Sequence, residues 1–116
     1  MKVLVTGSRD WVNRAAIEEG FDILEPTLVI HGNGKGADWI AAAVAATRNL
    51  DIACFPANWN RRGPAAGPYR NRLMYDLMQP DAVLAFPLPQ SRGTVDMITY
   101  AESQGCGVIL VKGRDF

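Results

Sequence analysis

The sequence predicts one α/β domain, a doubly wound parallel sheet of about five strands with helices on both faces. Apolar segments rich in β-branched residues alternate with helix-forming segments along the whole chain. None of the apolar segments alternates polar with apolar residues, which is typical of strands buried on both faces. The 116 residues are 48% hydrophobic and 21% charged, as expected for a single domain over residues 1–116.

The predicted strands end in turn-forming residues. Glycine or proline follows four of them directly and the fifth after one residue, and the five strands are 2–6, 27–31, 51–55, 81–86 and 107–111. We expect right-handed crossovers between these strands. Because parallel strands all run in the same direction, we expect their carboxyl ends at one edge of the sheet.

Start and stop residues mark the first and last predicted helices. Asn13 is a candidate N-cap and Pro26 stops the first helix, although Gly20 weakens it. The last helix spans residues 94–104, and Gly105 follows it as a C-cap glycine.

Composition predicts the two middle helices. Residues 38–49 are rich in alanine, the best helix former, and the expected apolar stripe is Ile40, Ala43, Val44 and Thr47. The next helix begins at Gly67-Pro68, because proline suits the first helical position. Its expected apolar face is Leu73, Leu77, Met74 and Met78.

The charge balance and the apolar runs exclude several functional classes. Twelve Lys plus Arg balance twelve Asp plus Glu, so no net field attracts nucleic acid or an anionic membrane. No apolar run approaches the ~18 residues of a membrane span, and no signal peptide is recognisable, which predicts a cytoplasmic protein. Cys54 and Cys106 lie in or beside apolar segments without metal-ligand spacing, so we expect two small buried side chains and no metal.

Basic residues gather in the segments that follow the predicted strands. Ligands of open parallel sheets bind beyond the carboxyl ends of the strands, where helix N-termini also offer free N–H groups. Half of the twelve basic residues fall at or near this edge: Arg9, Lys35, Arg61, Arg62, Arg70 and Arg92. A positive rim on a neutral protein favours a small phosphorylated ligand.

Two segments are candidate phosphate sites. The loop from Gly32 through Gly34 to Gly36 joins a strand to a helix, so its backbone amides could approach a phosphate closely. It lacks the Walker A pattern and matches the dinucleotide fingerprint only in part, so a plain tight turn is the alternative. The second candidate is the helix start at Gly93-Thr94, where the hydroxyls of Ser91 and Thr94 could donate; a simple helix cap is its alternative.

Four further side chains each have two interpretations. His31 is either an acid or base facing the ligand or a residue that holds its loop. Asp38 either caps the helix or binds ribose hydroxyls. Arg70 and Asn71 either reach the crevice from the first turn of their helix or lie on the surface.

In this order and spacing, four motifs resemble the YspA-core type domain of the SLOG superfamily over nearly the whole chain. They are Gly7-Ser8-Arg9; His31-Gly32-x-Gly34-x-Gly36-Ala37-Asp38; Gly67-Pro68-x-Arg70-Asn71-x-x-Met74; and Ala85-Phe86-Pro87 with Ser91-x-Gly93-Thr94-x-Asp96-Met97. The resemblance implies a Rossmann-like fold that binds a nucleotide or nucleotide-derived ligand, in some members as a sensor and in others as an enzyme. It implies a pocket made by Gly7, Ser8, Arg9, residues 32–38, Arg70, Asn71 and residues 91–94, and leaves a homo-oligomer open.

The related Lonely Guy phosphoribohydrolases carry a PGGxGTxxE segment, which this chain matches in part. Gly93-Thr94 matches the GT, whereas Met97 stands in the place of the catalytic glutamate and residues 87–92 replace the paired glycines. Asp96 lies one residue earlier, ~100° around the helix. It is either a catalytic carboxylate or a first-turn acid favoured by the helix dipole.

The sequence thus predicts a small domain that binds a nucleotide or nucleotide derivative, with no cofactor. The alternative is a nucleotide N-glycosidase that uses Asp96 or Asp38 as its carboxylate. A third hypothesis is single-stranded nucleic-acid binding through residues 59–62, against which the neutral net charge argues.

Overall fold

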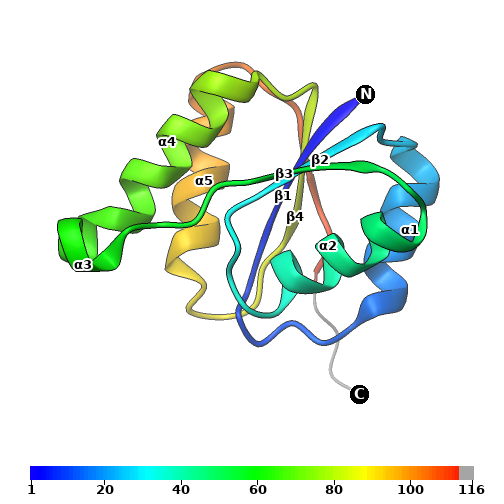
Figure 1. The fold of residues 1–116 in the computed structure, drawn as a ribbon, viewed down its shortest axis with the longest axis horizontal. Helices are drawn as coiled ribbons and strands as arrows, with labels where there is room; N and C mark the ends of the chain where they lie inside the picture. Colours follow the sequence, from blue (N-terminus) through cyan, green and yellow to red (C-terminus); the bar gives the residue numbers. More distant parts are fainter. Residues whose placement is uncertain (113–116) are drawn as a thin grey trace.

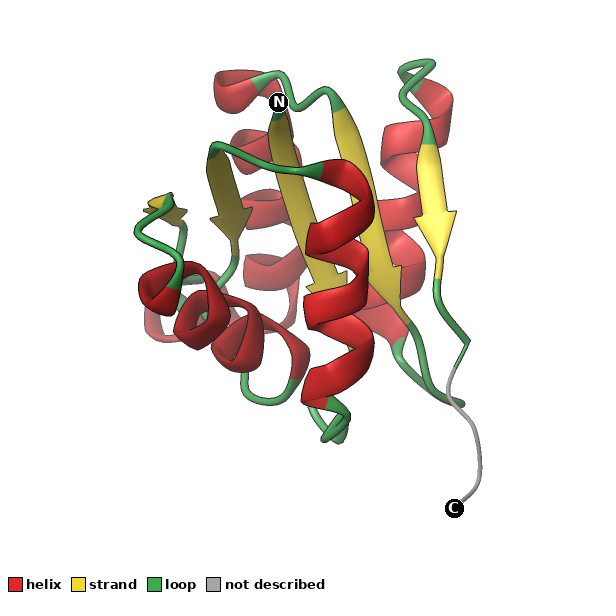
Figure 2. Cartoon of the chain, turned by 90° about the vertical axis from the view of Figure 1, so that its right-hand side faces the viewer, coloured by secondary structure: helices red, strands yellow, loops and turns green. Residues whose placement is uncertain are grey.

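The computed structural model describes residues 1–112, and its strands form one five-stranded sheet in the order β3-β2-β1-β4-β5 (Figures 1 and 2). All neighbouring strands are parallel, with Val3 of the central strand opposite Val29 and Ala82 of its two neighbours. The strands are β1 (Lys2–Gly7), β2 (Leu28–His31), β3 (Asp51–Cys54), β4 (Ala82–Phe86) and β5 (Val108–Leu110). The predicted fold class is confirmed, and each predicted strand is present with slightly different ends.

The four predicted helices are also present. They are α1 (Arg14–Leu24), α2 (Ala37–Thr47), α4 (Ala66–Met78) and α5 (Arg92–Ser103). Between β3 and α4 lie two short elements that the sequence analysis did not predict, α3 (Trp59–Arg62) and the 3₁₀ turn η1 (Gly63–Ala65). Figure 1 shows α3 projecting from the body of the molecule beside the start of α4.

Helices cover both faces of the sheet, which explains the continuously apolar strands (Figure 2). On one face α1 and α2 pack over Val3 and Val5, and on the other Leu4 packs with the buried residues Met74 of α4 and Met97 of α5. Successive residues of β1 therefore enter opposite layers of the core.

Helix α1 begins as predicted and depends on its glycine. The Asn13 side chain accepts a hydrogen bond of 3.1 Å from the amide of Ala16, and Glu25, in the left-handed region at φ 52°, ends the helix. A Cβ at Gly20 would lie 2.8 Å from Leu84 Cδ2. The glycine that weakens the helix allows it to approach β4 closely.

The predicted apolar faces of α2 and α4 are wrong in part. In α2, Ala43 and Thr47 are exposed, and the buried residues are Ala37, Asp38, Ala41, Val44 and Ala45. In α4, Leu73 and Leu77 are 40% and 64% exposed, while Met74 is buried. Each helix carries two adjacent stripes of apolar residues, and only the position of the sheet decides which stripe is covered.

The cysteine prediction is also corrected. Cys54 is exposed, because β3 is an edge strand, and Cys106 is half-buried; both are free thiols. Within residues 1–112, no three His, Cys, Asp or Glu side chains are grouped as a metal site would require. None of the helices in the same part of the chain is both long and apolar enough for a bilayer.

Candidate ligand site at the carboxyl edge of the sheet

The loops that follow β1, β2 and β4 meet at one edge of the sheet (Figure 1). The amide of Ser8 donates to the carbonyl of Phe86 at 3.0 Å, and the amide of Ala37 donates to the carbonyl of Ser8 at 3.1 Å. Gly36 has a φ of 74°, and a Cβ there would collide with the carbonyl oxygens of Ser8 and Arg9. Gly36 is therefore required for the contact between two loops, whether or not a ligand is bound.

Asp38 closes the glycine-rich loop from inside. Its Oδ2 accepts hydrogen bonds from the amides of Gly32 and Gly34, both at 3.1 Å. The residue is 8% exposed, and its Oδ1 is buried with no hydrogen-bond partner among residues 1–112. Burial raises the pKa of Asp38 to about 6, although the two loop amides and Arg70 oppose the shift.

His31 holds the start of the same loop. Its Nδ1 accepts a hydrogen bond of 3.0 Å from the amide of Asn33. Burial, and to a smaller extent the charge of Arg70, lowers the pKa of His31 below its usual value. This geometry matches the second interpretation of His31, a neutral residue that holds its loop, and not an acid or base that faces the ligand.

Arg70 and Asn71 join the glycine-rich loop to the start of α5. The Nη1 of Arg70 donates to the carbonyls of Gly32 at 2.6 Å and Phe55 at 3.3 Å, and its Nε donates to Asn71 Oδ1 at 2.9 Å. The Nδ2 of Asn71 then donates to the carbonyl of Gly93 at 3.2 Å. Neither is a freely solvated surface side chain: Asn71 is 3% exposed, and burial lowers the pKa of Arg70.

The carboxylate of Asp96 is engaged by two neighbours. Both guanidinium NH₂ groups of Arg72 donate to it at 3.1–3.3 Å, and Asn71 Nδ2 donates to its Oδ2 at 3.0 Å. This arrangement ties α4 to α5. The sequence analysis did not identify Arg72 as a partner of Asp96. Its position directly after Arg70 and Asn71 was the one signal in the sequence that it lies near the same residues.

The start of α5, unlike the glycine-rich loop, has no side chain among residues 1–112 bound to its backbone amides. Ser91 stands at its N-cap without a side-chain cap bond, and its hydroxyl instead accepts from the amide of Leu88 at 3.2 Å. A Cβ at Gly93 would meet nothing within 4 Å, while Thr94 is 3% exposed. A groove of about 650 Å³ runs along one side of this helix start, bordered by Leu88, Ser91, Arg92, Val95 and Asp96, but not by Gly93 or Thr94. A smaller hollow of about 270 Å³, between Phe21 and Arg48, includes none of the predicted site residues.

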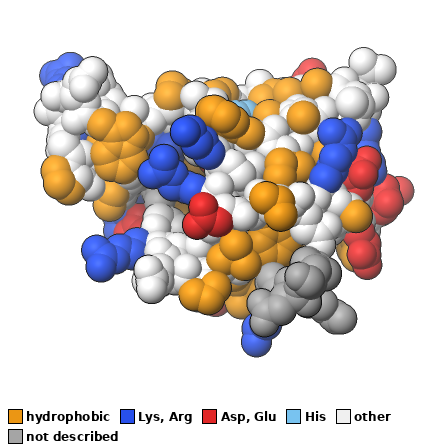
Figure 3. All heavy atoms as spheres, turned by 90° about the horizontal axis from the view of Figure 1, so that it is seen from below, with side chains coloured by type: hydrophobic (Ala, Val, Ile, Leu, Met, Phe, Trp, Pro, Cys, Tyr) orange, Lys and Arg blue, Asp and Glu red, His pale blue; other side chains and the backbone are white. Residues whose placement is uncertain are grey.

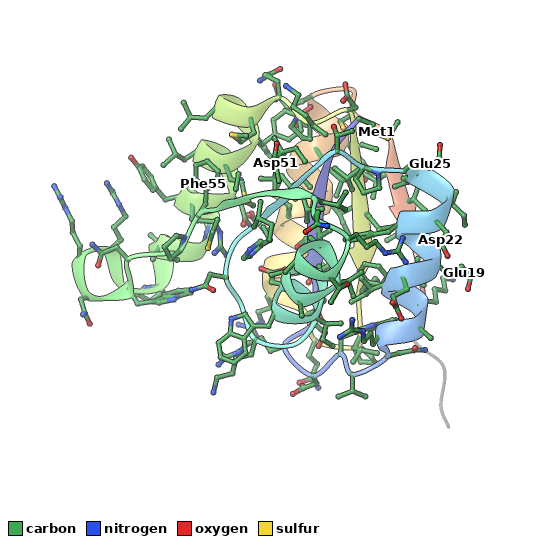
Figure 4. The ribbon with its side chains drawn as sticks, turned by 45° about the vertical axis from the view of Figure 1, so that its right-hand side comes forward. Met1, Glu19, Asp22, Glu25, Asp51 and Phe55 are labelled. Carbon is green, nitrogen blue, oxygen red and sulfur yellow. The ribbon has the colours of Figure 1, made fainter. Side chains whose placement is uncertain are left out.

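The remaining predicted residues divide between loop support and exposure. Ser8 is buried, and its Oγ accepts from the amide of Asp10 at 3.0 Å. Arg9, Lys35 and Arg92 are exposed. Figure 3, which views the molecule from this edge, shows Lys and Arg side chains spread over the face with apolar side chains between them. The acidic residues Glu19, Asp22 and Glu25 lie instead along α1 (Figure 4).

The projecting α3 carries an aromatic and basic surface. Trp59 is 58% exposed, and the edge of its ring lies over Gly67, where a Cβ would be 3.1 Å away. Arg61 and Arg62 are exposed, and the Arg62 guanidinium lies 3.5 Å from the centre of the Tyr69 ring.

The fold and the sequence both match known proteins. DNA processing protein A from Streptococcus pneumoniae superposes with a TM-score of 0.78 and 20% identity over 97% of this chain, which spans 50% of that one. This Rossmann-like neighbour shows the fold alone. The Gene 61 protein of Mycobacterium phage D29 is 35% identical over an alignment of 118 positions, which covers 93% of this chain and 94% of that protein. The model of the YspA, cpYpsA-related SLOG family matches residues 1–62. The expected resemblance is confirmed, and the chain belongs to this family, YAcAr.

Proposed function

We propose that the protein binds a nucleotide or nucleotide-derived ligand in the crevice at the carboxyl edge of the sheet. The observation that supports this most is the first turn of α5, which has no side-chain cap and lies beside an open groove. Free N–H groups and the helix dipole favour an anion at such a turn. Membership of the SLOG family agrees with a nucleotide-related ligand.

We place the phosphate at Gly93 and Thr94 in preference to the loop from Gly32 to Gly36. The amides of Gly32 and Gly34 already donate to Asp38. A phosphate at those amides would compete with a buried carboxylate and be repelled by its charge. At Gly93 no side chain stands in the way, and the exposed Arg92 on the same turn adds positive charge.

We assign the site to binding and not to hydrolysis of the glycosidic bond. A carboxylate that stabilises a sugar cation must face the sugar with an oxygen free to do so. The Asp96 oxygens accept from Arg72 and Asn71 instead, and Met97 is buried in the core. The free oxygen of Asp38, Oδ1, is shielded from solvent, and the other oxygen holds the glycine-rich loop. Ser8 and His31 then hold the loops around the ligand, Gly7 allows the close approach of Ala37, and the exposed Arg9 adds positive charge at the same edge.

A thermal-shift screen tests the proposal. AMP, ADP, ADP-ribose and NAD should each be added to the purified protein, and at least one should raise the melting temperature in a concentration-dependent manner. Chromatography of the same mixtures should show no released base. Released base that disappears in Asp96→Asn or in Asp38→Asn would refute the binding-only assignment, and no shift with any of the four would refute nucleotide binding.

The variant Gly93→Asp tests the place of the phosphate. It sets a negative charge where we place the phosphate, and its Cβ enters open space. We expect the fold to remain and the nucleotide shift to disappear. Gly107→Asp is the matched control, because Gly107 is also exposed with nothing within 4 Å of a Cβ. Equal shifts in both variants would exclude the α5 site.

A second candidate function is single-stranded nucleic-acid binding at α3. The exposed Trp59 beside Arg61 and Arg62 offers a base-stacking surface next to positive charge. The pneumococcal neighbour is a DNA-processing protein. This function predicts that a fluorescent oligonucleotide binds with a steep salt dependence and that Trp59→Ala weakens binding. Binding unchanged in Trp59→Ala would exclude this surface.

A further inference from the structure

The carboxylate of Asp38 is only half satisfied in the free protein. One oxygen, Oδ2, receives two loop amides, while Oδ1 is buried without a partner among the described residues. An unpaired buried carboxylate oxygen lowers stability, because it has lost its water and gained no donor. Such unfavourable groups, when they lie at a crevice, are often retained for function.

None of the neighbouring side chains that the structure describes donates to Oδ1 of Asp38. Arg70 points its Nη1 at the carbonyls of Gly32 and Phe55, and His31 Nδ1 accepts from Asn33. In this arrangement no described residue supplies a donor for Oδ1, so a bound ligand is the donor that we consider. A carboxylate oxygen accepts from O–H or N–H groups and repels phosphate, so the incoming group is a donor and not an anion.

We propose that Oδ1 of Asp38 accepts a hydrogen bond from the bound ligand, which presents a hydroxyl or amino group to the glycine-rich loop and its phosphate to α5. This inference rests on the proposed nucleotide-binding function and adds the orientation of the ligand. The ends of β2 and β4 flank β1, so the two ends of the site are on the order of 10 Å apart, two strand spacings. A nucleotide, with phosphate at one end and sugar or base donors towards the other, suits this separation.

For a ligand to reach Oδ1 of Asp38, residues 33–35 must move by a small distance. Oδ1 is shielded from solvent in the free protein, whereas Asn33 and Lys35 are exposed. Gly34 lies against the carboxylate, where a Cβ would be 3.4 Å from Oδ2. Without a side chain at Gly34, only the backbone of this short segment has to move there.

The variant Asp38→Asn tests the inference with AMP as the probe. The amide oxygen of Asn can still accept from Gly32 and Gly34, but an NH₂ donor replaces Oδ1. We expect the fold to remain and the affinity for AMP, measured by calorimetry, to fall at least tenfold. Asp51→Asn is the control, since it removes the same charge from an exposed position (Figure 4). Asp51 is the first residue of β3 and so lies at the amino edge of the sheet, away from the proposed site.

Modified nucleotides identify the donor without any substitution. Wild-type protein should lose affinity for 2′,3′-dideoxy-AMP if the donor is a ribose hydroxyl, and for purine riboside monophosphate if it is the exocyclic amine of the base. The affected analogue should bind Asp38→Asn no more weakly than AMP does, because the same interaction is already lost.

Two outcomes would overturn the inference. If Asp38→Asn binds AMP as tightly as wild type, or if wild type binds AMP and both analogues equally, Oδ1 receives no donor from the ligand and nucleotide binding itself still stands. If wild type binds no AMP at all, both proposals fail for this nucleotide.

Discussion

Replacing Asp38 should change how the stability of the protein depends on pH. The carboxylate is 8% exposed and lies under the loop whose amides it accepts. Burial is the largest cause of its shift and raises its pKa from 3.8 to about 6. Because Asn cannot ionise, Asp38→Asn removes this contribution while keeping a similar shape.

The shift fixes both the size and the sign of the effect. The folded protein binds the proton more tightly than the unfolded chain, so the contribution is fully present below the unfolded-state pKa of 3.8 and is lost as the pH rises through about 6. A shift of this size corresponds to about 3 kcal/mol, at 1.36 kcal/mol per pKa unit. Between pH 7.5 and pH 4.5, wild type should gain about 2 kcal/mol of unfolding free energy relative to Asp38→Asn.

Urea unfolding followed by tryptophan fluorescence provides the measurement. Both proteins are unfolded at several values of pH, and only the difference between them is compared, because other carboxylates titrate equally in both. A difference that stays constant from pH 7.5 to pH 4.5, or one that changes with the opposite sign, would refute the assignment of a buried, poorly satisfied carboxylate at Asp38.

Three further substitutions test the architecture of the site. Gly36→Ala should destabilise the protein by about 1–3 kcal/mol because of its positive φ and the loop carbonyls beside it, whereas Gly107→Ala should be nearly neutral; equal melting temperatures for the two would contradict this. Arg70→Met should cost about 2–3 kcal/mol in urea unfolding, since two carbonyls lose a charged donor, and an unchanged midpoint would show that the network is dispensable. Phe86→Ala should cost about 3–5 kcal/mol, because the ring is fully buried with its centre 5.2 Å from that of Trp11; a loss below 1 kcal/mol would be inconsistent with that packing.

Local sequence patterns were sufficient for the five strands, for the four longer helices and for the edge of the sheet where the loops meet, but not for α3 and η1. The uninterrupted apolar strands indicated burial on both faces, and the turn residues after each strand indicated where the loops meet. The Asn13 cap was predicted from its residue type and found with the expected hydrogen bond. These features are local, since each depends on a few neighbouring residues and on the periods of strands and helices.

Side-chain assignments were less predictable where two local solutions were equivalent. Leu73 and Met74 lie on adjacent stripes of α4, and only Met74 is buried. Cys54 was expected to be buried, but its strand lies at the edge of the sheet. Strand order depends on contacts between residues far apart in the chain, and no short segment contains that information.

The sequence by itself determined the fold class, the order of the strands and longer helices along the chain, and the segments that lie at the carboxyl edge. Only the tertiary structure decided what each of them contacts there. Asp38 turns its carboxylate to Gly32 and Gly34, and Asp96 is engaged by Arg72 from another helix. The physical reason is that hydrogen-bond partners and burial depend on distances between separate elements, which arise only when the helices pack on the sheet.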